Sequence, residues 1–113
     1  MAYFLWQHLS APLSVTQVHV HTDRVRVGCE QTALVTALVR SEGGAGTIRY
    51  RWLRSDGNVS GVLRQSVADG EEQTVLPLRW TFHGHGTYDA VAVVEILSPT
   101  VYTSSVALTY RCS

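Results

Sequence analysis

The sequence predicts an all-β domain, built as a two-sheet antiparallel sandwich of about seven strands. Three observations predict it: apolar residues recur at every second position in several segments, Gly- and Pro-containing turns separate these segments, and no segment carries a helical stripe. The length of 113 residues indicates one domain. We expect the sandwich over residues 15–113, after an N-terminal extension and linker at residues 1–14.

The strand at 47–54 is the most informative of the predicted strands. Ile48, Tyr50 and Trp52 share one face, and Arg49 and Arg51 share the other, which predicts one dry and one wet face. The predicted strands in chain order are 15–21 with a short continuation at 24–27, 32–40, 47–54, 62–68, 73–82, 87–97 and 101–111.

Two of these strands carry features of sheet edges. The pattern at 62–68 is weak, and the strand at 73–82 contains Pro77, which cannot donate a backbone hydrogen bond. Its apolar positions, Leu76, Leu78, Trp80 and Phe82, share the opposite face. We therefore expect 62–68 near an edge, and Pro77 where its missing N–H is not needed.

Aromatic residues mark the expected core and make the sandwich immunoglobulin-like. Trp52 fits the core tryptophan of the third strand, and Trp80 lies on an inward face. Tyr88 opens the sixth strand, where a tyrosine corner is expected, its hydroxyl bonding back to upstream backbone. Ala90 occupies the position of the second core cysteine of immunoglobulin domains, so the cross-sheet cysteine pair is missing. Two aromatic residues in an unrelated β-core are the alternative.

The two cysteines, Cys29 and Cys112, need a different geometry from that pair. Strands in such a sandwich alternate in direction, so the start of the second strand and the end of the seventh lie at the same pole. We therefore expect a disulfide there and an oxidising compartment. Two free buried thiols are the alternative.

A family resemblance appears when these features are combined. The pattern of Val18-x-Val20, Gly28-Cys29, the run at 50–57 (YRWLRSDG), Trp80 and a terminal Cys112 resembles small Ig-like domains of actinobacterial exported or membrane-anchored proteins. Such domains sometimes form the extracellular part of receptor-type serine/threonine kinases. The resemblance covers about Val15 to Cys112. It implies an extracytoplasmic accessory or sensing module without catalytic residues, and it supplies no ligand.

Composition and motifs argue against several function classes. The net charge is zero and the arginines are dispersed, so we expect no nucleic acid partner. No apolar run is long enough to insert in a membrane. Nucleophile-elbow, phosphate-loop and His-Glu-x-x-His motifs are missing from the sequence, so we expect no enzyme activity and no cofactor.

Four histidines are the candidate metal ligands, with Asp23 or Asp89 as a further ligand. His19 and His21 share one face of a strand, and His83 and His85 flank a glycine at a corner. Zinc needs three or four converging ligands, which requires these two places to be neighbours. We favour solvated surface histidines and predict no metal.

The first residues, Met1 to Leu9, lack the features of a secretory signal, because their apolar run is short and is interrupted by Gln7 and His8. The segment from Tyr3 to Leu9 is apolar, and it could pack on the sandwich, extend a sheet or drive self-association.

We expect a non-catalytic extracytoplasmic module for binding, sensing or spacing within a larger exported protein, with an unknown protein or cell-envelope ligand as its partner. The alternative is a carbohydrate-binding module that uses exposed aromatics, with Trp6 and Tyr102 as the candidates.

Overall fold

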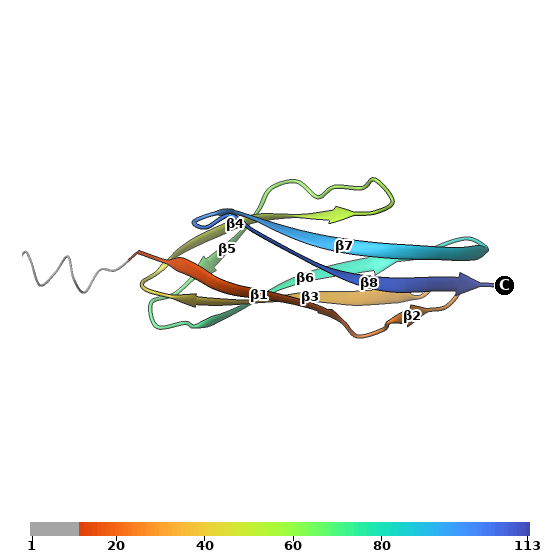
Figure 1. The fold of residues 1–113 in the computed structure, drawn as a ribbon, viewed down its shortest axis with the longest axis horizontal. Coiled ribbons are helices and arrows are strands. Elements are labelled where there is room, and N and C mark those ends of the chain that lie inside the picture. Colours follow the sequence, from red (N-terminus) through yellow and green to blue (C-terminus); the bar gives the residue numbers. More distant parts are fainter. Residues whose placement is uncertain (1–11) are drawn as a thin grey trace, which may run out of the picture.

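The computed structural model describes residues 12–113. The regular secondary structure in this part of the chain consists of β-strands alone. Two sheets face each other as a sandwich (Figure 1), which confirms the predicted fold class. The strands are β1 (Ser14–Thr22), β2 (Arg26–Val27), β3 (Thr32–Glu42), β4 (Gly46–Arg54), β5 (Leu63–Val67), β6 (Gln73–Thr81), β7 (Gly86–Ser98) and β8 (Tyr102–Cys112).

The strand order divides the chain into a three-stranded sheet, β1-β3-β6, and a five-stranded sheet, β2-β8-β7-β4-β5. All neighbours are antiparallel except β2 and β8, which run parallel. The predicted continuation of the first strand at 24–27 is therefore wrong in one respect: the chain crosses to the other sheet there. Asp23 holds the crossover, because its carboxylate accepts the backbone N–H of Leu34 at 2.8 Å.

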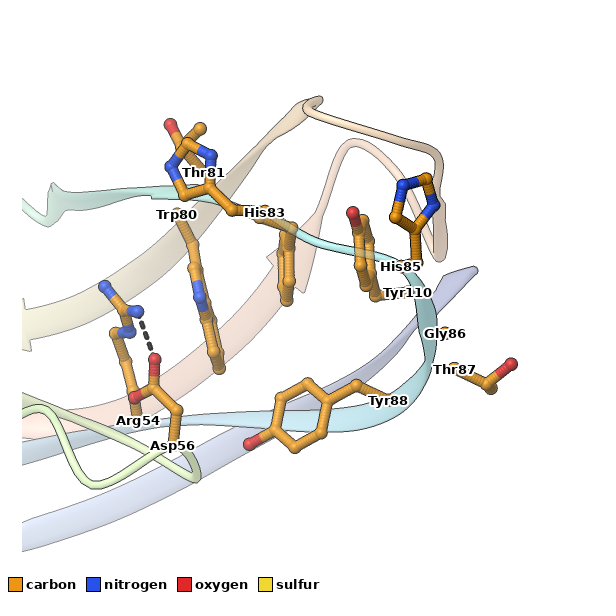
Figure 2. A pocket seen from close by; sticks show the side chains of 11 residues that line it. Arg54, Asp56, Trp80, Thr81, His83, His85, Gly86, Thr87, Tyr88 and Tyr110 are labelled. Atoms are coloured by element: carbon orange, nitrogen blue, oxygen red, sulfur yellow. Dashed lines mark hydrogen bonds and ion pairs between the residues drawn. The ribbon is translucent and has the colours of Figure 1, made fainter. Parts of the chain in front are cut away.

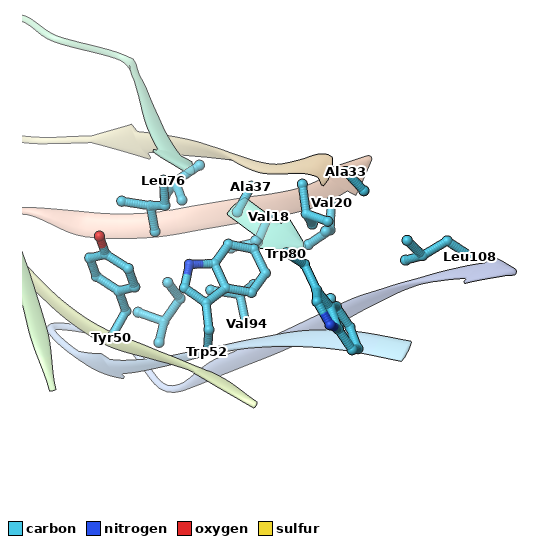
Figure 3. Packing of buried hydrophobic residues seen from close by; sticks show 14 of the residues in the cluster. Val18, Val20, Ala33, Ala37, Tyr50, Trp52, Leu76, Trp80, Val94 and Leu108 are labelled. Atoms are coloured by element: carbon cyan, nitrogen blue, oxygen red, sulfur yellow. The ribbon is translucent and has the colours of Figure 1, made fainter. Parts of the chain in front are cut away.

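The core lies between the inward faces of the two sheets, as the period-2 alternation requires (Figure 3). Trp52 of β4 and Trp80 of β6 are each only 1% exposed. Ile48 and Tyr50 are buried on the same face of β4 as Trp52. On the wet face, Arg51 pairs with Glu95 of β7 at 2.7 Å.

The strand expected near an edge lies there, and the strand that contains Pro77 is also an edge strand. β5 ends the five-stranded sheet, and β6 ends the three-stranded sheet. Pro77 of β6 pairs in register with Thr36 of β3. Because β6 has a neighbour on one side only, a missing donor interrupts no second ladder.

The sandwich has two ends, which we name the hairpin pole and the disulfide pole. The hairpin pole contains Pro12, the β3–β4 turn at 43–45 and the β7–β8 turn, where the hydroxyl of Thr100 accepts the N–H of Val15. The disulfide pole contains Cys29, the β6–β7 corner at 82–85 and the end of β8.

The sandwich begins slightly before the expected boundary at residue 15. Leu13 is buried in the core, and β1 starts at Ser14. The end of the expected linker is therefore part of the folded domain. In residues 12–113 no helix is long and apolar enough to cross a membrane.

Candidate functional site

A cleft of about 370 Å³ opens near the disulfide pole (Figure 2). Its walls come from the end of β4 and the turn after it, from the end of β6 and the following corner, and from the start of β7, with Tyr110 contributed by β8. Three stretches of the chain that are distant in sequence therefore build it.

One wall of the cleft is a stack of planar side chains. The guanidinium carbon of Arg54 lies 4.4 Å from the ring centroid of Trp80. Trp80 stacks on Phe82 with centroids 4.8 Å apart, and Phe82 stacks on Tyr110 at 5.1 Å. Neighbouring ring planes in this stack differ by only 15°, and Figure 2 shows Trp80 and Tyr110 on the same wall of the cleft. Each inner ring is covered on both faces, so the stack offers the cleft mainly ring edges, which carry partial positive charge.

The Arg54 guanidinium is also held by Asp56, which accepts a hydrogen bond from it across the β4–β5 turn. Asp56 accepts further bonds from the backbone and side chain of Asn58. Partial burial acts to raise the pKa of Asp56, but the bonds from Arg54 and Asn58 outweigh it and hold this pKa below its ordinary value. The carboxylate is thus ionised and engaged, which leaves it poorly suited to act as a general base.

The tyrosine-corner bond predicted for Tyr88 is not formed, and the tyrosine that bonds to the β6–β7 corner is Tyr110. The Tyr110 hydroxyl donates to the backbone carbonyl of Gly84 in the β6–β7 corner. The Tyr88 hydroxyl lies 2.6 Å from that of Ser55, and Tyr88 is only half-buried. The physical reason is direction: the Tyr88 ring borders the cleft beside the β4–β5 turn, whereas Tyr110 stacks under the corner.

The predicted disulfide is present between Cys29 and Cys112, across 83 residues of sequence, with Cα atoms 4.7 Å apart. Neither thiol is free, so the alternative of two free thiols is not supported. The two cysteines differ in environment, because Cys29 lies in an exposed turn while Cys112 is 5% exposed. The Nδ1 atom of His85 lies 3.7 Å from Sγ of Cys112.

The four candidate histidines do not converge. His19 and His21 lie side by side on the exposed face of β1, with ring centroids 6.0 Å apart. His83 pairs with Glu30, and His85 lies beside the disulfide. Over residues 12–113 no group of three or more His, Cys, Asp or Glu side chains could hold a metal ion.

The pair of Glu30 and His83 ties the turn after Cys29 to the β6–β7 corner. Glu30 accepts a hydrogen bond from His83 and another from the backbone N–H of Gly84. These two bonds, the larger effect being that of His83, lower the pKa of Glu30 below its ordinary value. Both side chains are well exposed.

Sequence reasoning missed two constellations. The stack needs Arg54 and Tyr110 from strands far from Trp80 in sequence, and only the i, i+2 spacing of Trp80 and Phe82 was visible. The second is a like-charge pair: Arg49 and Arg64 face each other across β4 and β5. Their register depends on the β4–β5 pairing, which the sequence does not specify.

The aromatics proposed for a carbohydrate site lie elsewhere. Tyr102 is half-buried and packs against the core. Trp6 and the apolar segment from Tyr3 to Leu9 fall outside the residues that the structure describes.

Comparison with known proteins supports the fold. No family model and no curated protein matches the chain. Two structures of the CARDB domain of the PF1109 protein from Pyrococcus furiosus do match. The crystal structure, in complex with di-metal ions, has a TM-score of 0.61 and 20% identity over 91% of this chain and 96% of that one. The solution structure has a TM-score of 0.64 and 18% identity over 88% and 95%.

A third structure is the alkylpurine DNA glycosylase AlkC from Pseudomonas fluorescens, bound to DNA containing an abasic site analog. The match has a TM-score of 0.55 and 15% identity, and it covers 89% of this chain but 31% of the glycosylase. At such identities the likeness shows the fold alone. The chain therefore shares its Ig-like sandwich fold with these CARDB domains.

Proposed function

We propose that this chain is a non-catalytic accessory module of an exported protein, and that it acts as a covalently clamped spacer between other parts of that protein. The observation that carries the proposal is the position of the disulfide. The described chain enters at the hairpin pole and ends at the opposite pole (Figure 1), where Cys112 is bonded to Cys29.

The disulfide also supports an extracytoplasmic location. Disulfides form and persist in oxidising compartments and are rare in the cytosol, where thiols are kept reduced. This one closes a long loop, because its cysteines are separated by 83 positions in the sequence, and such loops gain most from a cross-link in the chain-entropy treatment.

A spacer of this design resists extension when it is pulled from its two poles. Tension entering at the end of β8 passes through the sulfur atoms of Cys112 and Cys29, and the chain between them carries no load. Only the part from Pro12 to Cys29, which includes β1 and β2, can be drawn out. The module then keeps most of its fold under load.

Single-molecule force extension tests this reading. Each extended residue spans at most about 3.6 Å, so the fully stretched length is roughly 6 nm for the oxidised domain and roughly 37 nm for the reduced domain. The gain on extension is each of these lengths minus the folded pole-to-pole length, so it is far smaller for the oxidised domain. A Cys29→Ser variant is the matched control and behaves like the reduced domain with or without reductant. An oxidised domain that extends as far as the reduced one contradicts the clamp.

The non-catalytic part of the proposal rests on the cleft. Its carboxylate, on Asp56, is engaged by Arg54 and Asn58, and one of its walls is a stack of rings. A cleft of this kind holds a partner better than it activates a nucleophile. The partner remains a protein or cell-envelope ligand.

Carbohydrate binding is the alternative, and the Tyr88 side of the cleft favours it. Sugars stack on ring faces, and Tyr88 is the half-buried ring that lines the cleft outside the stack. Titration with soluble cell-wall oligosaccharides, followed by tryptophan fluorescence, tests this alternative. Saturable quenching that Tyr88→Ala removes establishes it, and an unchanged spectrum leaves the spacer role alone.

We do not carry over the ligands of the structural neighbours. The PF1109 domain was crystallised with di-metal ions, but the histidines of this chain lie apart. AlkC was bound to DNA, whereas the net charge here is zero. An actinobacterial origin and an association with a receptor-type kinase stay predictions from the sequence resemblance.

Self-association through the segment from Tyr3 to Leu9 also stays a prediction. Sedimentation of the full chain and of residues 12–113 tests it. A concentration-dependent increase in mass that only the full chain shows supports the role of this segment, and identical behaviour of the two proteins rejects it.

A further inference from the structure

We propose that the disulfide is a thiol-exchange site with a fixed direction: a small-molecule thiolate attacks Cys29, and Cys112 departs as a thiolate beside His85. The proposal concerns the reactivity of the bond and does not depend on the spacer role.

The first argument is the unequal exposure of the two cysteines. Cys29 lies in the exposed turn between β2 and β3, whereas Cys112 is 5% exposed at the end of β8. Exchange requires the attacking thiolate to reach a sulfur atom, so access is one of the factors that sets its rate. Access therefore selects Cys29 as the site of attack.

The second argument is the histidine beside the leaving sulfur. His85 places Nδ1 3.7 Å from Sγ of Cys112. A departing thiolate gains a charge there, and an imidazole N–H donor stabilises it, because a neighbouring histidine lowers the pKa of a thiol. The acidic side chain of Glu30, which lies near the same pole, is already engaged by His83. A better leaving group is expelled faster.

A hollow of about 350 Å³ borders Cys112, and its lining does not include Cys29, so attack on Cys112 is the competing outcome that the trapping experiment separates. One further feature favours exchange at Cys29. Glu30, which follows Cys29, has a φ of +57°. Non-glycine residues adopt this left-handed conformation at an energetic cost, so cleavage lets the turn relax.

The chemical step balances without an external oxidant. The attacking thiolate forms a new S–S bond to Sγ of Cys29, and the Cys29–Cys112 bond breaks with both electrons going to Cys112. The products are a mixed disulfide on Cys29 and a thiolate on Cys112, which takes up a proton from solvent or from His85. The thiol is incorporated, and the net number of disulfide bonds does not change.

The direction of attack is tested by trapping. The oxidised full chain is incubated with glutathione under native conditions, alkylated with N-ethylmaleimide in acid-quenched aliquots, and digested for mass spectrometry. We expect glutathione on Cys29 and maleimide on Cys112 at early times. A mixed disulfide mainly on Cys112, or an even split, overturns the proposal. In denaturant, where access is equal, the preference should vanish.

The role of His85 is tested by the initial rate of the same reaction. A hydrogen bond to a developing charge is worth enough to change the rate about fivefold or more, so His85→Ala should be slower by that factor. His19→Ala is the matched control, because His19 lies on the exposed face of β1 in the other sheet and should leave the rate near that of the wild type. All variants are compared at one pH, so the ionised fraction of glutathione is the same in each reaction and does not contribute to the difference in rate.

The fold is checked in each variant by tryptophan fluorescence, since Trp52 and Trp80 are buried. If His85→Ala is folded and reacts as fast as the wild type, the assigned role of His85 is wrong. If His85→Ala is destabilised, His85→Gln, which keeps an N–H donor near the sulfur, must restore the rate for the proposal to stand.

Discussion

At the hairpin pole, the chain enters through space that only glycine leaves open. A Cβ atom on Gly43 would lie 2.0 Å from the carbonyl oxygen of Pro12, and one on Gly46 would lie 3.0 Å from Cδ2 of Leu13. At the disulfide pole, added Cβ atoms on Gly84 and Gly86 would meet nothing within 4 Å. That end is closed by a covalent bond and by a stack of aromatic rings.

The difference shows that one sandwich can close its two ends by different physical means. The hairpin pole depends on close backbone approach, which any added side-chain atom disturbs. The disulfide pole leaves open space at Gly84 and Gly86, where an added side chain would meet only the cost of their positive φ angles, but this pole depends on a bond that a reductant can break. We therefore expect the two poles to fail under different perturbations.

The largest expected effect is at the disulfide pole. The Cys29→Ser and Cys112→Ser double variant should lose about 4–5 kcal/mol of unfolding free energy, because the open chain regains the entropy of a long loop. Urea unfolding followed by tryptophan fluorescence measures this loss. A loss near 1 kcal/mol would mean that the aromatic contacts, and not the bond, close this pole.

The core that both poles share comes next. Trp52→Ala should cost about 3–5 kcal/mol, because it leaves a large cavity between the sheets. Leu53→Ala is the control, since Leu53 is the next residue on the opposite, half-buried face of β4, and it should cost clearly less. Equal losses in urea unfolding would contradict the assigned faces.

The hairpin pole is tested by two glycines with similar backbone angles. Gly43 has a φ of +98° and Gly57 a φ of +93°, but an added Cβ meets Pro12 only at Gly43. The conformational penalty therefore cancels between Gly43→Ala and Gly57→Ala. Gly43→Ala should be the less stable by about 1–3 kcal/mol, the usual cost of overpacking. Equal thermal midpoints would show that the entry of the chain is not tightly packed.

The smallest effect separates two tyrosines. Tyr110→Phe removes the hydroxyl that donates to Gly84 and should cost about 0.5–1.5 kcal/mol. Tyr88→Phe should cost less, because water can replace its bond with Ser55, which is exposed. Thermal unfolding at one pH compares them. A larger loss for Tyr88→Phe would restore to Tyr88 the corner role that its position in sequence predicts.

The local features of the fold could be predicted because they depend on short-range spacing. The inward set of Ile48, Tyr50 and Trp52 follows from the two-residue period of a strand, and the edge position of β6 follows from Pro77. The pairing of Cys29 with Cys112 also followed, because strand direction alternates and fixes which ends share a pole.

Most of the candidate site could not be predicted from the sequence, because it depends on contacts between distant residues and not on short-range spacing. The stack joins Arg54, Trp80, Phe82 and Tyr110 from three strands and two sheets. Which of them meet depends on the register between strands and on the angle between sheets. One-residue changes in register turn a side chain to the other face, so a pattern within one strand cannot specify such contacts.

By itself, the sequence determined the fold class, most strand positions, their dry faces and the disulfide, because all of these follow from local periodicity and strand direction. Only the tertiary structure decided that β2 crosses to the second sheet, that Tyr110 and not Tyr88 bonds to the β6–β7 corner, and that the histidines lie apart with His85 beside Cys112. These features depend on contacts between residues far apart in sequence, which arise only when the two sheets pack together.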